Sequence, residues 1–325
     1  MTNRFKQIKR DGCDNDRLFF SLLEKKGLHV LRREFINDRV QLVYTKQGIK
    51  IMKGFETRED LLFQWDFCRF GKEKGNEQIV HYEFFPDGSR SIAYGGRFWG
   101  LMPFLPGTCL NFTNIRDQQQ ACSSLQRFHD TYQGFFHDTT NRRWRLIPQW
   151  SKRIRRFHCL MDCFPCHDRS LFKDVLYWGY YALSMLAYEP VDVMEKEAER
   201  KKTWIHGDVA PHNFVRLACD DIRVVDFDLV AMAPTDYDFL QLANRILVCN
   251  GWDLHGLCVS IPQFEDMLNQ RWFLLSLIYP SDLFREWNQF YFGRSDVNRL
   301  TLLEYSEKQF VLRFSAVREL IHMIY

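Results

Sequence analysis

The chain lacks any run that approaches the about 20 apolar residues of a membrane-spanning helix. Its first 20 residues are polar and basic, where a secretory signal has an apolar centre. We therefore expect a cytoplasmic protein with no membrane partner. In that compartment its ten cysteines should be reduced thiols rather than structural disulfides.

The chain also lacks a marked excess of either charge. It has 44 Lys and Arg against 41 Asp and Glu, and the formal net charge of +3 is too small to imply a nucleic-acid partner. A hydrophobic content of 46% over 325 residues is ample for a packed core, in two domains or one bilobed domain. We predict a globular protein without a nucleic-acid partner.

The segment of residues 203–242 has the strongest chemical pattern. Asp208 is followed five residues later by Asn213, and a short apolar run then leads to Asp226. This order suits phosphoryl transfer from a magnesium-bound nucleotide, a reaction that depends on positioning and charge neutralisation. Asp208 would accept the proton of an attacking hydroxyl, while Asn213 and Asp226 would offer the hard oxygen ligands that Mg²⁺ prefers. His206, in the same catalytic loop, suits a bracing role better than that of a base.

The pattern H-G-D-x-x-x-x-N followed by D-F-D resembles the aminoglycoside phosphotransferase and choline kinase family, which has a protein-kinase-like fold. The segments WIHGDVAPHNF, VVDFDLVAMAPTDYDFLQL and LQRFHDTYQGF look most like the spore coat kinase-like proteins of the CotS and YutH type. The resemblance implies transfer of the γ-phosphate of ATP, with Mg²⁺, to a hydroxyl of a small molecule or protein. GTP in place of ATP stays open. The spore coat resemblance adds a second possible location and other coat proteins as possible partners.

The resemblance implies an α+β, bilobed fold with a small N-terminal antiparallel β lobe and a larger, mostly helical C-terminal lobe. We expect a nucleotide-binding lobe over residues 1–102, a hinge over 103–107 and a catalytic, acceptor-binding lobe over 108–325. Hydrophobic periodicity and turn residues predict further detail in the first lobe. The expected elements are a helix over 14–26, three strands within 34–55, a helix over 58–74, and two strands over 79–89 and 90–105.

In the family, a strand lysine reaches the nucleotide phosphates. Lys50 and Lys53 lie on opposite faces of the expected strand, so only one can do so. Lys53 is the better candidate because two apolar residues precede it, as in the family. Asp66, in the helix over 58–74, is the expected carboxylate partner of Lys53.

Backbone groups near Phe104, in the proline-stiffened hinge, and near Met102, just before it, are expected to bind the adenine edge. A glycine-rich phosphate loop is missing, since residues 33–40 contain no glycine. The nucleotide prediction therefore depends mainly on the C-terminal motifs.

Two further acids follow the metal motif. Asp228 would add a metal oxygen or remain a solvent-facing turn acid, and the sequence does not decide between them. Asp238, near the start of a helix, matches the family residue that braces the catalytic loop.

Two other clusters have competing interpretations. Cys159, Cys163 and Cys166 have a spacing that suits zinc or an iron–sulfur cluster, although plain thiols are the simpler interpretation. The basic run over 153–156 is expected to be a solvated helix face rather than a binding patch. The function of the whole protein also has a competing interpretation: a spore coat scaffold with a kinase-like fold and little catalysis is the alternative to an enzyme. The terminal helices, where the family builds its acceptor pocket, show no clear excess of the acids that an aminoglycoside would require.

Overall fold

The structure is a computed structural model that describes residues 13–138, 142–164, 168–293 and 297–325. The chain forms two compact units, each assembled from three chain segments. Unit 1 takes its residues from 1–109, 135–141 and 212–228, and unit 2 from 110–134, 142–211 and 229–325. Each unit is described by itself below.

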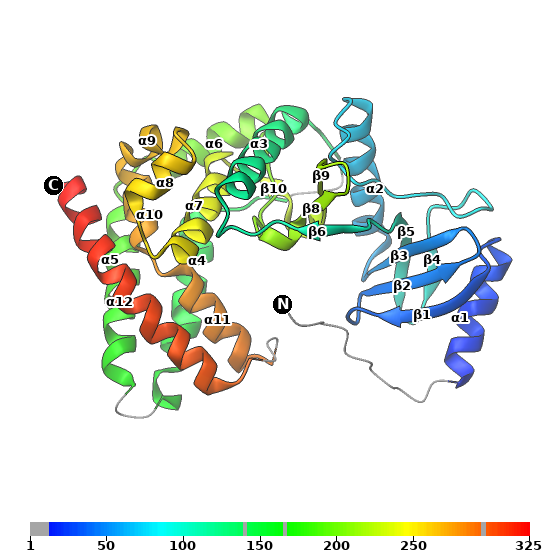
Figure 1. Cartoon of the computed structure of the whole chain (residues 1–325), viewed down its shortest axis with the longest axis horizontal. Coiled ribbons are helices and arrows are strands. Elements are labelled where there is room, and N and C mark those ends of the chain that lie inside the picture. The colour runs from blue at the N-terminus through cyan, green and yellow to red at the C-terminus, as the bar shows by residue number, and fades with distance from the viewer. Residues whose placement is uncertain (1–12, 139–141, 165–167, 294–296) are drawn as a thin grey trace. The chain divides into compact units, whose positions relative to one another are not determined.

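Unit 1 contains a five-stranded antiparallel sheet in the order β1-β2-β3-β5-β4 (Figure 1). Its strands are β1 (Val30–Phe35), β2 (Val40–Thr45), β3 (Gly48–Phe55), β4 (Ile92–Tyr94) and β5 (Arg97–Pro103). Helix α1 (Cys13–Lys25) covers one face, where its Phe19 joins a buried cluster with Met52 and Trp99. Side chains alternate along a strand, so Lys53 points to the opposite face from Met52.

Helix α2 (Arg58–Glu73) packs against β3 and β5. It begins after Thr57, whose hydroxyl accepts a hydrogen bond from the Asp60 backbone N–H at 3.1 Å. This cap satisfies one of the free donors at the start of the helix.

One expected strand is absent and another is divided. Residues 79–89 do not form a strand: they pair only through isolated bridges at Ile79 and Glu83. Alternate burial in this segment reflects packing rather than strand pairing, because buried Tyr82 contacts Phe55 and Trp65. The expected strand over 90–105 is the hairpin β4–β5, whose turn at Gly95 and Gly96 has positive φ at both residues.

A three-stranded antiparallel sheet completes unit 1. It consists of β6 (Gly107–Cys109), β8 (Phe214–Leu217) and β9 (Ile222–Val224), in the order β6-β8-β9. The 3₁₀ turn η2 (Pro211–Asn213) precedes β8, and η3 (Phe227–Leu229) follows β9.

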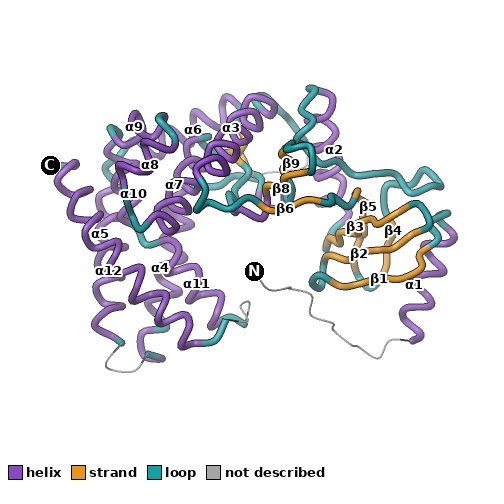
Figure 2. The backbone as a smooth tube through the Cα atoms, viewed as in Figure 1, coloured by secondary structure: helices purple, strands orange, loops and turns teal. Residues whose placement is uncertain are grey.

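Unit 2 is mostly helical (Figure 2). Its α-helices are α3 (Ile115–Tyr132), α4 (Leu146–His158), α5 (Arg169–Leu186), α6 (Val191–Lys201), α7 (Asp236–Asn250), α8 (Leu254–Ser260), α9 (Gln263–Leu268), α10 (Arg271–Ile278), α11 (Ser281–Tyr291) and α12 (Arg299–Ile324). A 3₁₀ turn, η1 (Met161–Cys163), and two short antiparallel strands, β7 (Trp204–Ile205) and β10 (Ala231–Met232), complete it. The predicted α+β class, with an N-terminal antiparallel sheet and a helical C-terminal part, is confirmed.

None of the described helices combines the length and the apolar character needed to span a membrane.

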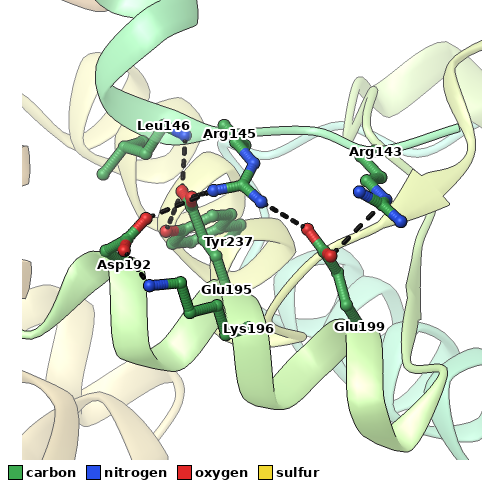
Figure 3. A network of polar contacts seen from close by, with 8 residues as sticks. All are labelled: Arg143, Arg145, Leu146, Asp192, Glu195, Lys196, Glu199 and Tyr237. Atoms are coloured by element: carbon green, nitrogen blue, oxygen red, sulfur yellow. Dashed lines mark hydrogen bonds and ion pairs between the residues drawn. The ribbon is translucent and has the colours of Figure 1, made fainter.

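A polar network ties α4, α6 and α7 together (Figure 3). The buried Glu195 carboxylate accepts hydrogen bonds from the Leu146 backbone N–H at 2.8 Å and from the Tyr237 hydroxyl at 2.9 Å. Arg145 adds an ion pair to Glu199 at 2.8 Å. Because its carboxylate is buried and accepts both of these hydrogen bonds, Glu195 fixes the start of α4 against α7.

Candidate active site

In unit 1, Lys53 is buried and bridges two acids. Its Nζ lies 2.6 Å from Oδ1 of Asp226 and 2.7 Å from Oδ1 of Asp228. Burial acts to lower the pKa of Lys53, but the two carboxylates outweigh it and raise that pKa. Lys50 points to the other face of β3 and pairs with Glu83 at 2.7 Å. The lysine chosen from the sequence is therefore the one that contacts the D-F-D acids.

The third metal candidate, Asn213, lies at the same end of the β8–β9 hairpin as Asp226. Phe214 pairs with Val224, and the Asn213 carbonyl accepts a hydrogen bond from Val225 N–H at 3.0 Å. Asn213 is buried just before the first strand, and Asp226 follows the second. The hairpin therefore brings together two residues that belong to separate sequence motifs. Asp226 has φ of 66°, in the left-handed region that aspartate tolerates better than most residues.

The predicted pair of Asp66 with Lys53 is wrong. Asp66 instead contacts Arg69 at 3.1 Å and His137 at 3.3 Å. The residue of α2 that faces the acids is Gln64, whose Nε2 donates to the Phe227 carbonyl at 2.6 Å. At 100° per residue, Asp66 lies about 200° around the helix from Gln64 and cannot share its direction.

Cys68, one turn after Gln64, lies on the same side of α2. Burial raises the pKa of its thiol to about 12, and the nearby Lys53 opposes that rise. The side of the helix that faces Lys53 thus carries an amide and a neutral thiol. Asp226 and Asp228 take the role that the sequence assigned to Asp66.

The hinge candidates are at the end of β5. Met102 is buried and pairs with Ile51 of β3, while Phe104 follows Pro103 and is about one-third exposed. Their adenine contacts stay a prediction.

In unit 2, the predicted catalytic loop follows β7 and is held by Asp238. This fully buried carboxylate accepts hydrogen bonds from the backbone N–H of His206 at 2.7 Å and of Gly207 at 2.9 Å. His129 Nε2 donates to the same carboxylate at 2.9 Å. The buried His206 ring in turn accepts from the Asp208 N–H, with 3.3 Å between Nδ1 and N. Asp238 and His206 thus hold the backbone on both sides of the turn that presents Asp208.

Gly207 is required by the shape of this turn. Its φ is +80°, and a Cβ built there would lie 2.3 Å from the Leu229 carbonyl oxygen. A side chain would have both an unfavourable backbone conformation and a collision with backbone.

We expect Gly207→Ala to lower the free energy of unfolding by about 3 kcal/mol or more, since the left-handed conformation alone costs about 1–2 kcal/mol. Gly134→Ala is the matched control, because Gly134 has the same φ of +80° and nothing within 4 Å of its added Cβ. It should lose about 1 kcal/mol. Denaturant unfolding would measure both variants, and equal losses would contradict the proposed collision.

Asp208 lies at the wall of a cavity of about 320 Å³ within unit 2. Its Oδ1 is 3.3 Å from Nη2 of Arg245, which comes from α7. Burial is the main reason that the pKa of Arg245 is lowered to about 10; the charge of Arg285 also acts to lower it, whereas Asp208 acts to raise it. We call this space the acceptor cavity, because the sequence resemblance predicts that this lobe binds the acceptor. Its polar lining includes three arginines and two aspartates: Arg153, Arg245, Arg285, Asp208 and Asp282.

The sequence interpretation missed Gln241, Asn244 and Arg245, which project from α7 into the acceptor cavity. Gln241 also accepts a hydrogen bond from Val209 N–H at 3.3 Å. These three residues follow Asp238 at intervals of three or four residues, which places all four on one face of α7. The helical repeat could therefore have identified this face from the sequence.

The cysteine cluster shows no metal geometry in the part that the structure describes. Cys159 and Cys163 are exposed free thiols, and Cys166 lies outside the described residues. Among the residues described, no group of three or more His, Cys, Asp or Glu side chains is arranged to hold a metal ion.

Several solved structures share this fold. An aminoglycoside phosphotransferase from Alicyclobacillus acidocaldarius matches with a TM-score of 0.72 and 16% identity, over 91% of this chain and 92% of that one. A spectinomycin phosphotransferase, in complex with ADP and spectinomycin, has a TM-score of 0.59 and 16% identity, over 92% and 98%. A choline kinase from Streptococcus pneumoniae has a TM-score of 0.53 and 12% identity, over 94% and 99%. No curated protein matches the sequence.

The model of one family, described as the phosphotransferase enzyme family, matches residues 35–257. This range covers more than half of the chain and contains Lys53, the catalytic loop, the D-F-D acids and Asp238. The chain therefore belongs to the phosphotransferase enzyme family.

Proposed function

We propose that this protein transfers the γ-phosphate of ATP to a hydroxyl of a small molecule, in the presence of Mg²⁺. The observation that carries the proposal is the buried Lys53, held by Asp226 and Asp228 at 2.6 and 2.7 Å. A buried ammonium between two acids is suited to contact nucleotide phosphates while the acids hold a metal ion. Solved neighbours in complex with ADP, AMP or GDP support nucleotide binding.

The donor set fits Mg²⁺. The carboxylates of Asp226 and Asp228 already converge on one cation, the Lys53 ammonium, and Asn213 adds an amide oxygen at the same end of the hairpin. Hard oxygen donors of this kind are the ligands that Mg²⁺ prefers. When bound, the ion would neutralise phosphate charge, with Asn213, Asp226 and Asp228 as its protein ligands.

Asp208 is the proposed base. The acceptor hydroxyl would lie in the acceptor cavity, where Asp208 takes its proton as the hydroxyl oxygen bonds to the γ-phosphorus. The bond from that phosphorus to the bridging oxygen of ADP breaks, and ADP leaves with the electron pair. Arg245 fixes the direction of the Asp208 carboxylate, whereas His206 and Asp238 position its backbone.

Replacing Lys53 by methionine should weaken MgATP binding by at least about tenfold, because a charge-assisted contact of about 1.5–3 kcal/mol is lost. Lys50→Met is the matched control on the same strand, since Lys50 faces the other way and pairs with Glu83. Nucleotide-induced thermal stabilisation would be measured for both, with and without EDTA. Absence of stabilisation in the wild type, together with absence of ATP turnover, would overturn the proposed function.

A second candidate rests on the three segments that resemble spore coat kinase-like proteins. In that case the protein would keep the fold, and perform a structural role in the coat with little catalysis. The same measurements separate the two, because a scaffold would transfer no phosphate to any member of a metabolite or spore-extract panel, even where it binds ATP.

A further inference from the structure

A second cavity of unit 2, of about 410 Å³, has a strongly basic lining. Its cationic residues are Lys152, Arg153, Arg156 and Arg285, and the rest of its lining consists of amide side chains and one phenylalanine. None of the residues that line it is an acid. We call it the basic cavity.

The basic cavity lies along two packed helices. Lys152, Arg153 and Arg156 recur at helical spacing on α4, while Arg285 and Asn288 do so on α11. The Asn288 side chain donates to the Arg153 carbonyl at 3.0 Å and so ties the two helices side by side (Figure 1). The start of α4 is fixed by Glu195, so the basic side chains project from a firmly held helix.

Few acids neutralise these cations. Within the described chain, Lys152, Arg153 and Arg156 have no ion pair, and Arg153 donates only to the Ser281 hydroxyl at 3.2 Å. Arg285 is paired with Glu286 at 2.8 Å. Burial lowers the pKa of Arg153 and the neighbouring charge of Arg285 lowers it too, while Tyr279 and Asp282 act to raise it. A bound anion would relieve that repulsion.

The basic cavity and the acceptor cavity share two residues, since Arg153 and Arg285 line both. On the acceptor side, the two acids are already engaged. Asp208 contacts Arg245, and Asp282 is held by the buried Arg313 and by the Tyr305 hydroxyl at 3.0 Å. The charge left for a ligand is therefore positive. Such a site is unsuited to bind a polycation such as an aminoglycoside.

We propose that the acceptor is an anionic hydroxyl compound, whose hydroxyl lies at Asp208 and whose phosphate or carboxylate group binds in the basic cavity. This inference rests on the proposed function and assigns the substrate class of the same site. Guanidinium groups bind both kinds of anion through paired hydrogen bonds, which a neutral or cationic acceptor could not use.

The test uses the full chain saturated with MgADP, so that the nucleotide phosphates occupy their own site. Binding of inorganic phosphate would be titrated by calorimetry in the wild type, in the double variant Lys152→Ala/Arg156→Ala and in Arg155→Ala. Arg155 is the matched control, because it is an exposed arginine of the same helix that does not line the cavity. We expect at least about tenfold weaker phosphate binding in the double variant alone. Equal affinity in all three proteins would overturn the proposal.

A second arm compares phosphate transfer to three matched acceptors, glycerol, glycerol 3-phosphate and glycerate, and to the polycation kanamycin. Faster transfer to glycerol 3-phosphate would indicate a phosphate group on the natural acceptor, and faster transfer to glycerate a carboxylate. Preference for glycerol or for kanamycin would overturn the proposal. Stabilisation by MgADP should be the same in every variant, so its absence would instead mark a failure of the proposed function.

Discussion

Asp208→Asn should reduce phosphate transfer by about 10²- to 10⁴-fold, the range expected when a general base is lost. The amide has nearly the same shape but cannot take the acceptor proton. Nucleotide binding should be unchanged, because the proposed phosphate contact comes from Lys53 and the proposed metal ligands are Asn213, Asp226 and Asp228, all in unit 1. ADP release would be followed with water alone and with a panel of hydroxyl acceptors.

The same substitution should have little effect on folding. Asp208 and Arg245 form a partly exposed ion pair, and such pairs contribute at most about 1 kcal/mol. Asp266→Asn provides the control, because Asp266 is an exposed acid of unit 2 on α9, outside the acceptor cavity. A rate in Asp208→Asn within a factor of three of the control would remove Asp208 from the chemistry.

The motif-bearing part of the site could be predicted because short-range pattern and chemistry agree there. His206 and Asp208 lie two residues apart in one loop, and Asp238 lies in the first turn of α7. Gly207 shows why the residue type at such a position is restricted: its positive φ disfavours a side chain, and the nearby Leu229 carbonyl leaves no room for one. In such segments the local backbone alone restricts which residues fit.

Long-range partners were harder to predict. The sequence cannot show which side of α2 faces β3, so Asp66 appeared to be the natural partner of Lys53. The actual orientation is set by packing of apolar residues such as Leu61 and Phe63, and it directs Gln64 and Cys68 inward. A carboxylate at several positions of the helix would be chemically suitable as a partner of Lys53. Only positions on the side of the helix that faces β3 can reach it.

The basic run on α4 shows a related limit. Sequence pattern alone favours a solvated face for Arg153 and Arg156, since most charged stripes are exposed. The structure leaves Arg156 exposed, as expected, and it also places both arginines beside α11, which contributes Arg285 from more than 100 residues away. A cavity formed by two helices that are distant in the sequence leaves no recognisable pattern in the sequence of either one. The same reasoning applies to residues 79–89. Packing of Tyr82 gives this segment the alternation of buried and exposed side chains that is typical of a strand, although the segment pairs with other strands only through isolated bridges.

Asp238→Ala should lower the free energy of unfolding by about 3–5 kcal/mol. The carboxylate is fully buried and accepts hydrogen bonds from His206 N–H, Gly207 N–H and the His129 ring. Its removal leaves these buried donors without that acceptor. Denaturant unfolding, analysed for both midpoint and slope, would measure the loss.

Asp236→Ala is the control for this substitution, two residues earlier on α7. Burial raises the pKa of Asp236, so folding disfavours its ionised form, and removing that carboxylate should cost less than about 1 kcal/mol. Asp238→Asn should fall between the two, because its single amide oxygen can accept from only part of the donor set. Where Asp238→Asn still folds, a loss of turnover with retained nucleotide stabilisation would show that Asp238 acts by positioning Asp208. An Asp238→Ala variant as stable as Asp236→Ala would show that the loop does not depend on this brace.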